Sequence, residues 1–118
     1  MPSKADHLTK TEGNARFAMS LTLDDQPSID WALVALFYSA MHHVEAYLAT
    51  RGEHLRSHRT RDSVVGRDSK LKPIFADYQE LKFYGYNARY EMLAFKARDV
   101  EIAVGHLEAI RLAILSFL

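Results

Sequence analysis

The segment HLRSHRTR, residues 54–61, places five arginine or histidine side chains in eight positions. An arginine guanidinium can hold a phosphate through two parallel hydrogen bonds, and a histidine imidazole can give or take a proton near neutral pH. Six residues separate Arg51 from His58. These two side chains could cleave RNA without a metal, because the ribose 2′-hydroxyl supplies the nucleophile. The spacing therefore predicts Arg51 and His58 as a catalytic pair.

The same segment also admits a structural interpretation. Its arginines could form a solvated turn, in which they satisfy carbonyl groups at helix ends or pair with Glu53, Asp62 and Asp68. If the segment faces RNA instead, its basic side chains bind phosphates. If the segment binds RNA, the predicted binding residues are four of its side chains and one arginine from a later segment. They are His54, Arg56, Arg59, Arg61 and Arg89.

Arg89 belongs to KFYGYNARYE, residues 82–91, which combines four aromatic residues with Lys82 and Arg89. Aromatic rings stack on bases and cations hold phosphates, which is the combination that single-stranded nucleic acid requires. At helical spacing most such rings would instead pack in the core. We expect Arg89 to lie beside a helix break between residues 87 and 95, where an anion can reach it.

Metal and cofactor sites are not predicted. His54 and His58 are four residues apart, but Ser57, a predicted helix cap, lies between them and separates their directions. His42 and Glu45, three residues apart, lie on an apolar helix, and we interpret His42 as a hydrogen-bonded core histidine. The chain has no cysteine, and it contains no glycine-rich phosphate loop, Ser/His/Asp arrangement or paired-carboxylate motif.

Charge is unevenly distributed along a chain whose net charge is zero. Residues 1–50 carry a balance of −3, residues 51–72 one of +4 and residues 73–118 one of −1. A local excess of positive charge is typical of a surface that faces an anion. Neither a secretory signal nor a long apolar span is present, so we expect a cytoplasmic protein with no membrane partner.

The elements that position these residues are all predicted to be helices. The 118 residues form a single domain, 1–118, with ordinary globular composition. We expect an all-α, up-and-down bundle of four long helices and one short helix, over residues 4–21, 28–51, 57–67, 74–87 and a last helix after residue 95. Pro27 is predicted as the breaker before the second helix, Ser28 as its N-cap and Gly52 as the glycine at its end.

The second predicted helix, residues 28–51, is apolar on two adjacent stripes, which places it at the centre of the bundle. Ser39, His43 and Thr50 leave a narrow polar edge on it. The side chains of this helix that we expect to be largely buried are Trp31, Phe37, Ala40, Val44 and Leu48. On the last helix, Val104, Ile114 and Phe117 are expected to remain as apolar surface, and we predict a homodimer that buries it.

The order of several segments resembles that of the HEPN superfamily of small helical domains. These segments are WALVALFYSAMHHVEAYLATRG, the following H…SH…R, then ARYE and a long final helix after KARDVEIA. The resemblance implies an up-and-down bundle of four or five helices that usually dimerises. Many members are metal-independent endoribonucleases of toxin–antitoxin or phage-defence systems that use an Arg-x4–6-His motif. Others are non-catalytic and bind a nucleotide or an associated protein such as a nucleotidyltransferase.

Two pairs of residues are candidates for that motif. Arg51 and His58 have the spacing of the motif, whereas Arg98 and His106 have its usual position near the C-terminus, with the polar Asp99 after the arginine. Seven residues separate the second pair, which turns the two side chains about 80° apart on a helix. From the resemblance we expect an RNA-binding or RNA-cleaving protein, with a non-catalytic partner module as the alternative.

Overall fold

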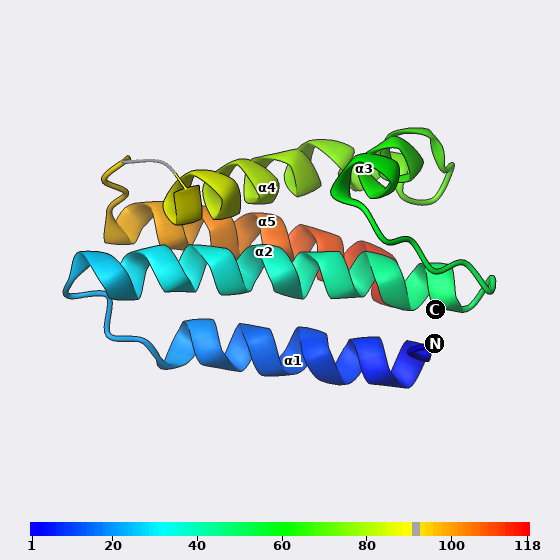
Figure 1. The fold of residues 1–118 in the computed structure, drawn as a ribbon, viewed down its shortest axis with the longest axis horizontal. Helices are drawn as coiled ribbons and strands as arrows, with labels where there is room; N and C mark the ends of the chain where they lie inside the picture. Colours follow the sequence, from blue (N-terminus) through cyan, green and yellow to red (C-terminus); the bar gives the residue numbers. More distant parts are fainter. Residues whose placement is uncertain (91–92) are drawn as a thin grey trace.

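The structure, a computed structural model, describes residues 1–90 and 93–118. These residues form five α-helices and one short 3₁₀ turn, and no strand occurs among them (Figure 1). The elements are α1 (Lys4–Ser20), α2 (Gln26–Ala49), α3 (His58–Arg67), η1 (Lys72–Ile74), α4 (Phe75–Tyr90) and α5 (Ala97–Leu115). The predicted all-α class is therefore confirmed. No helix in the described ranges is long and apolar enough to cross a membrane.

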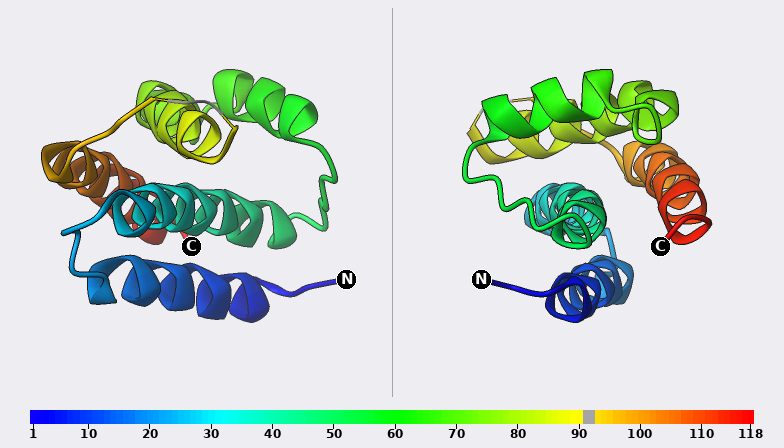
Figure 2. Two further views of the ribbon diagram at one scale, coloured as in Figure 1. Left: turned by 60° about the vertical axis from the view of Figure 1, so that its left-hand side comes forward. Right: turned by 90° about the vertical axis from the view of Figure 1, so that its right-hand side faces the viewer.

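Helix α2 lies at the centre of the arrangement, as its apolar pattern predicts. It packs against α1 on one side and against α4 and α5 on the other, and α4 and α5 also pack together (Figures 1 and 2). Helix α1 runs antiparallel to α2, and both chain termini lie near the same end of the molecule (Figure 1). The short helix α3 lies beside the first half of α4, above the C-terminal half of α2 (Figure 1).

Four of the five residues of α2 that were expected to be buried are buried, namely Phe37, Ala40, Val44 and Leu48. The prediction for Trp31 is wrong, because its side chain is 55% exposed. The reason is that Trp31 lies on the face of α2 between α1 and α4, which neither helix covers. Its ring instead borders a surface hollow together with Phe17 of α1 and Arg89 of α4.

The predicted polar edge of α2 is mostly buried. Ser39 and His43 are covered, whereas Thr50 is exposed. Ser39 faces α1, where its hydroxyl donates to the carbonyl of Thr11 over 2.9 Å and the Thr11 hydroxyl donates to the Ser39 carbonyl. These reciprocal bonds allow polar groups to lie in the interior. One turn away, Nδ1 of His42 lies 3.0 Å from Nδ1 of His7, so His42 is hydrogen-bonded as predicted, but it is half-buried and not part of the core.

Local capping residues explain where the helices begin. The hydroxyl of Ser57 accepts a hydrogen bond from the Thr60 amide over 3.1 Å, which confirms the predicted start of α3. Helix α2 begins earlier than predicted, because the cap is Asp25, whose carboxylate accepts from the Ser28 amide over 2.8 Å. Pro27 therefore lies inside the first turn, where an amide hydrogen has no partner to lose.

Two predictions about the C-terminal half need correction. Helix α4 continues to Tyr90, so the break expected from Asn87 onwards begins later, since neither proline nor glycine interrupts residues 86–90. The rest of that predicted break includes residues 91–92, which lie outside the described residues, as does the final glutamate of the ARYE segment. Ile114, expected as surface, is fully buried; Val104 and Phe117 are half-buried.

Candidate functional site

A cleft with a volume of about 620 Å³ opens between α2 and α4 at the N-terminus of α3. Ligand sites in proteins commonly have volumes of about 300–1,000 Å³, so the cleft is large enough for a nucleotide. It combines apolar, aromatic and cationic side chains from three helices. Its lining consists of Val34, Phe37, Tyr38, His58, Lys82, Gly85, Tyr86, Arg89 and Tyr90.

The floor of the cleft depends on a close approach of α2 and α4. A Cβ atom at Gly85 would lie only 2.8 Å from Cβ of Phe37, so only glycine fits there without movement of the helices. The Phe37 ring in turn lies 5.7 Å from the imidazole of His58 and 5.8 Å from the ring of Tyr78, measured between centroids. The buried Phe37 ring therefore fixes both the depth of the cleft and the position of His58 at its edge.

Arg89 is the main positive charge of the cleft. It lies in the last turn of α4, where its Nη1 donates to the Tyr38 hydroxyl over 2.8 Å and its guanidinium lies 5.1 Å from the centroid of the Tyr90 ring. No carboxylate within residues 1–90 and 93–118 pairs with it. Lys82, by contrast, forms an ion pair with Asp62 of α3. The guanidinium of Arg89 is thus held in place by aromatic side chains and keeps donors for an anion.

His58 is the first residue of α3, and its protonation is constrained by Arg61. Nη1 of Arg61 lies 3.1 Å from Nδ1 of His58. An arginine can only donate, so Nδ1 of His58 must accept, and the neutral ring carries its proton on Nε2. Burial lowers the pKa of His58 below its ordinary value, and the positive charges of Arg61 and Lys82 lower it further. At neutral pH, His58 is therefore an uncharged hydrogen-bond donor at Nε2.

Arg61 itself does not belong to an exposed basic patch, which corrects the sequence-based expectation. Its side chain is buried, with 5% of the residue exposed, and its Nε donates to the carboxylate of Glu45 over 2.5 Å. A buried cation requires such a partner, because an isolated charge in the interior is costly. Glu45 lies on α2, so this ion pair attaches α3 to the central helix and positions His58.

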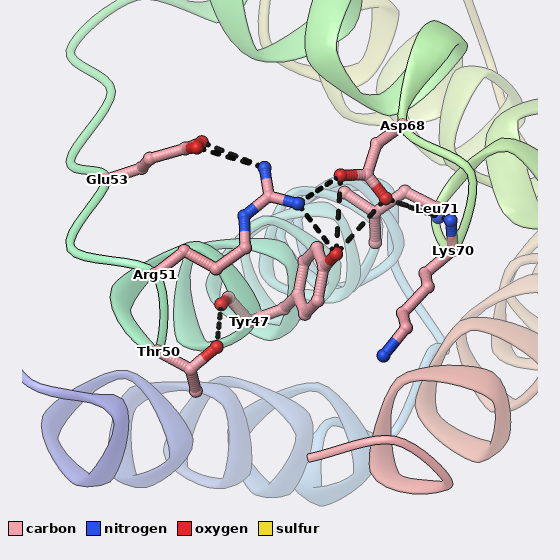
Figure 3. A network of polar contacts seen from close by, with 7 residues as sticks. All are labelled: Tyr47, Thr50, Arg51, Glu53, Asp68, Lys70 and Leu71. Atoms are coloured by element: carbon pink, nitrogen blue, oxygen red, sulfur yellow. Dashed lines mark hydrogen bonds and ion pairs between the residues drawn. The ribbon is translucent and has the colours of Figure 1, made fainter.

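Arg51 is engaged elsewhere, at the C-terminal end of α2 (Figure 3). Its Nη1 donates to Asp68 over 2.6 Å and to the Tyr47 hydroxyl over 2.9 Å, and its Nη2 donates to Glu53 over 3.0 Å. Burial alone would raise the pKa of Asp68. Hydrogen bonds from the Lys70 amide and from Arg51 instead hold this pKa below its ordinary value. Arg51 therefore forms the ion pairs that the structural interpretation expects, and it does not contact His58.

The remaining predicted residues are dispersed. Arg56 and Arg59 are exposed and His54 is half-buried, and none of the three lines the cleft. In the second candidate pair, Nδ1 of His106 lies 2.9 Å from the carboxylate of Asp77, while Arg98 is exposed in the first turn of α5. Of the predicted site residues, only His58 and Arg89 line the cleft, and Arg61 contacts His58 from behind it.

Several residues of the cleft were not singled out from the sequence as site residues. Tyr38 lies on an apolar stripe of α2 that predicts core, and Tyr86 lies among aromatic residues that predict core as well. The available signal was the association of Lys82 and Arg89 with four aromatic residues in one helix. In the part of the chain that the structure describes, no group of three or more metal-binding side chains occurs.

Comparisons with protein-family models, with curated proteins and with solved structures give no match to this chain.

Proposed function

We propose that this protein is a HEPN-like helical bundle that binds single-stranded RNA, with a phosphate of the RNA held in the cleft between α2 and α4. The proposal rests on the position of Arg89. Its guanidinium faces an aromatic-lined cleft, and no carboxylate of the described residues pairs with it. An arginine in this setting can hold a phosphate by two hydrogen bonds, while neighbouring rings accept a base. His58 adds a neutral donor.

The geometry supports binding better than cleavage. A general base needs a free ring nitrogen, yet Nδ1 of His58 accepts from Arg61 and Nε2 carries the proton. Arg51, the predicted phosphate holder, would have to leave both Asp68 and Glu53 before it could reach a substrate. The HEPN resemblance implies either RNA cleavage or a non-catalytic binding role, and we therefore favour the non-catalytic role. The helical order and the Ser57-His58 start of α3 are consistent with that resemblance.

Affinity for a short, fluorescently labelled single-stranded RNA, measured by anisotropy, tests the proposal. Arg89→Gln should weaken binding by about 10- to 100-fold, because a hydrogen bond to a charged group is lost. It should also reduce the slope of affinity against salt by about one counterion. Arg98→Gln, an exposed arginine outside the cleft, is the matched control and should bind as the unaltered protein does. Equal loss in both variants would contradict the proposal.

Incubation of the same RNA with the protein in EDTA separates binding from cleavage. We expect intact RNA. Products with 2′,3′-cyclic phosphates that disappear in His58→Ala would assign the catalytic role predicted from the sequence instead. If no RNA binds at all, the partner-module alternative gains support, with the cleft contacting an associated protein.

A further inference from the structure

A second hollow adjoins the cleft on the other side of Arg89. It has a volume of about 470 Å³ and is lined by Asn14, Phe17, Trp31, Val34, Ala35, Tyr38 and Arg89. Three of these residues, Val34, Tyr38 and Arg89, also line the cleft. The Arg89–Tyr38 hydrogen bond therefore forms the shared wall between two neighbouring depressions. A ligand that follows this surface meets Arg89 at the middle of its path.

The second hollow displays large aromatic rings that the fold does not use. Trp31 is 55% exposed and Phe17 is 49% exposed, although both lie on well-formed helices. Trp31 and Tyr38 are seven residues apart on α2, so they share one face of that helix and lie about 10 Å apart along its axis. Rings exposed in this way are available to stack on planar groups.

We propose, on the basis of the proposed function, that the ligand is at least a dinucleotide unit of single-stranded RNA. Its phosphodiester lies against Arg89, one base enters the cleft beside Tyr86, and the neighbouring base stacks on Trp31 in the second hollow. The order of the surface, aromatic then cation then aromatic, corresponds to the order base, phosphate, base along a strand. Stacking on exposed rings requires unpaired bases, which selects a single strand over a duplex.

The distribution of charge supports this occupant over an acidic protein. Lys82 is neutralised by Asp62, and burial together with Arg61 keeps His58 neutral. Among residues 1–90 and 93–118, this leaves Arg89 as the one cation without a carboxylate partner between the two hollows. One cation flanked by rings fits one phosphodiester flanked by bases. A second copy of this chain, or another protein, would also cover exposed aromatic side chains, and titration with a mononucleotide and a dinucleotide distinguishes these occupants.

Trp31 is the only tryptophan of the chain, so its fluorescence reports on the second hollow directly. The probes are uridine monophosphate and the dinucleotide UpU, with affinities measured by calorimetry and Trp31 emission recorded in parallel. We expect UpU to bind at least about 10-fold more tightly and to quench Trp31, although it carries less negative charge than the monophosphate. The monophosphate should occupy the cleft and leave Trp31 emission almost unchanged.

Substitution of the stacking ring provides the second test. Trp31→Leu should weaken UpU binding by about 5- to 100-fold, as loss of one base–aromatic stack does, and should not alter binding of the monophosphate. Ile102→Ala, an exposed apolar residue on α5, is the control and should change neither affinity. Thermal unfolding followed by circular dichroism checks that both variants fold.

Other results would overturn the inference. Equal affinities for the two probes, with no effect of Trp31→Leu, would show that the second hollow is unused, while the proposed function would stand. No binding of either probe, or of longer RNA, would refute the proposed function and this inference together. A change in Trp31 emission with protein concentration alone, unaffected by UpU, would assign this surface to contact between copies of the chain.

Discussion

A methyl group at Gly85 tests the close approach of α2 and α4 that forms the floor of the cleft. In Gly85→Ala the new Cβ would lie 2.8 Å from Cβ of Phe37 and 3.2 Å from its Cγ and Cδ2. Cβ of Phe37 is attached directly to the backbone of α2, so rotation of the side chain cannot relieve the overlap. The two helices must separate. Gly105 of α5 provides a matched control, because a methyl group there meets no atom within 4 Å.

Both substitutions gain helix propensity, but only Gly85→Ala overpacks a contact between helices. Replacement of glycine by alanine inside a helix stabilises it by about 1 kcal/mol. Gly105→Ala should therefore raise the free energy of unfolding by up to about 1 kcal/mol. Gly85→Ala has the same gain, but overpacking of a close contact costs about 1–3 kcal/mol. The difference between the two variants, about 1–3 kcal/mol in favour of Gly105→Ala, isolates the contact between α2 and α4.

Urea unfolding followed by circular dichroism measures both free energies, provided that the slope with denaturant is unchanged. RNA affinity adds a second readout, since separation of α2 from α4 deforms the cleft. The affinity should fall in Gly85→Ala and be retained in Gly105→Ala. If Gly85→Ala stabilises the protein as much as Gly105→Ala does, α4 does not approach Phe37 as described.

Three further predictions concern the buried charges, two histidines of α2 and the exposed face of α5. Arg61→Ala should lower the free energy of unfolding by about 3–5 kcal/mol, because it leaves Glu45 buried and unpaired, whereas Arg59→Ala on the exposed surface should change it by less than about 0.5 kcal/mol in urea unfolding. Burial lowers the pKa values of His42 and His43 to about 4, so between about pH 6.5 and pH 4 the unfolded chain binds more protons, and urea midpoints should fall as the pH is lowered through that window. Constant midpoints down to pH 4.5 would contradict the lowered pKa values of these two histidines. Light scattering at micromolar concentration should give a dimer, formed through exposed apolar residues such as Leu112 and Leu115 of α5; the mass of a single chain would refute this.

The parts of the fold that local chemistry determines could be predicted from the sequence. The start of α3 follows from Ser57, whose hydroxyl caps its own helix, and the central position of α2 follows from its apolar stripes. The start of α2 was predicted too late, because Asp25 and Ser28 are both good caps and Pro27 is compatible with either a loop or a first turn. Capping competition of this kind is decided by backbone geometry and not by residue type.

The site was less predictable because its residues are selected by contacts between distant segments. Nothing local in RSHRTR indicates that Arg61 is buried while Arg59 is exposed; Glu45, sixteen residues earlier, determines that difference. In the same way, Arg51 pairs with Asp68 across the loop and α3, which removes it from the neighbourhood of His58. The helical pattern predicts a buried Trp31, because such a pattern does not reveal which apolar face of a helix its neighbours leave uncovered.

Chemical-shift mapping of the ¹⁵N-labelled protein with a short single-stranded RNA tests whether RNA binds in the cleft around Arg89. We expect the largest amide shifts in the α2 segment around Tyr38, at His58 and in the last two turns of α4, with little change at Tyr47, Arg51 and Asp68. Shifts concentrated at Arg51, Arg56 and Arg59, with the cleft residues unmoved, would show that RNA binds at the basic residues predicted from the sequence and not in the cleft.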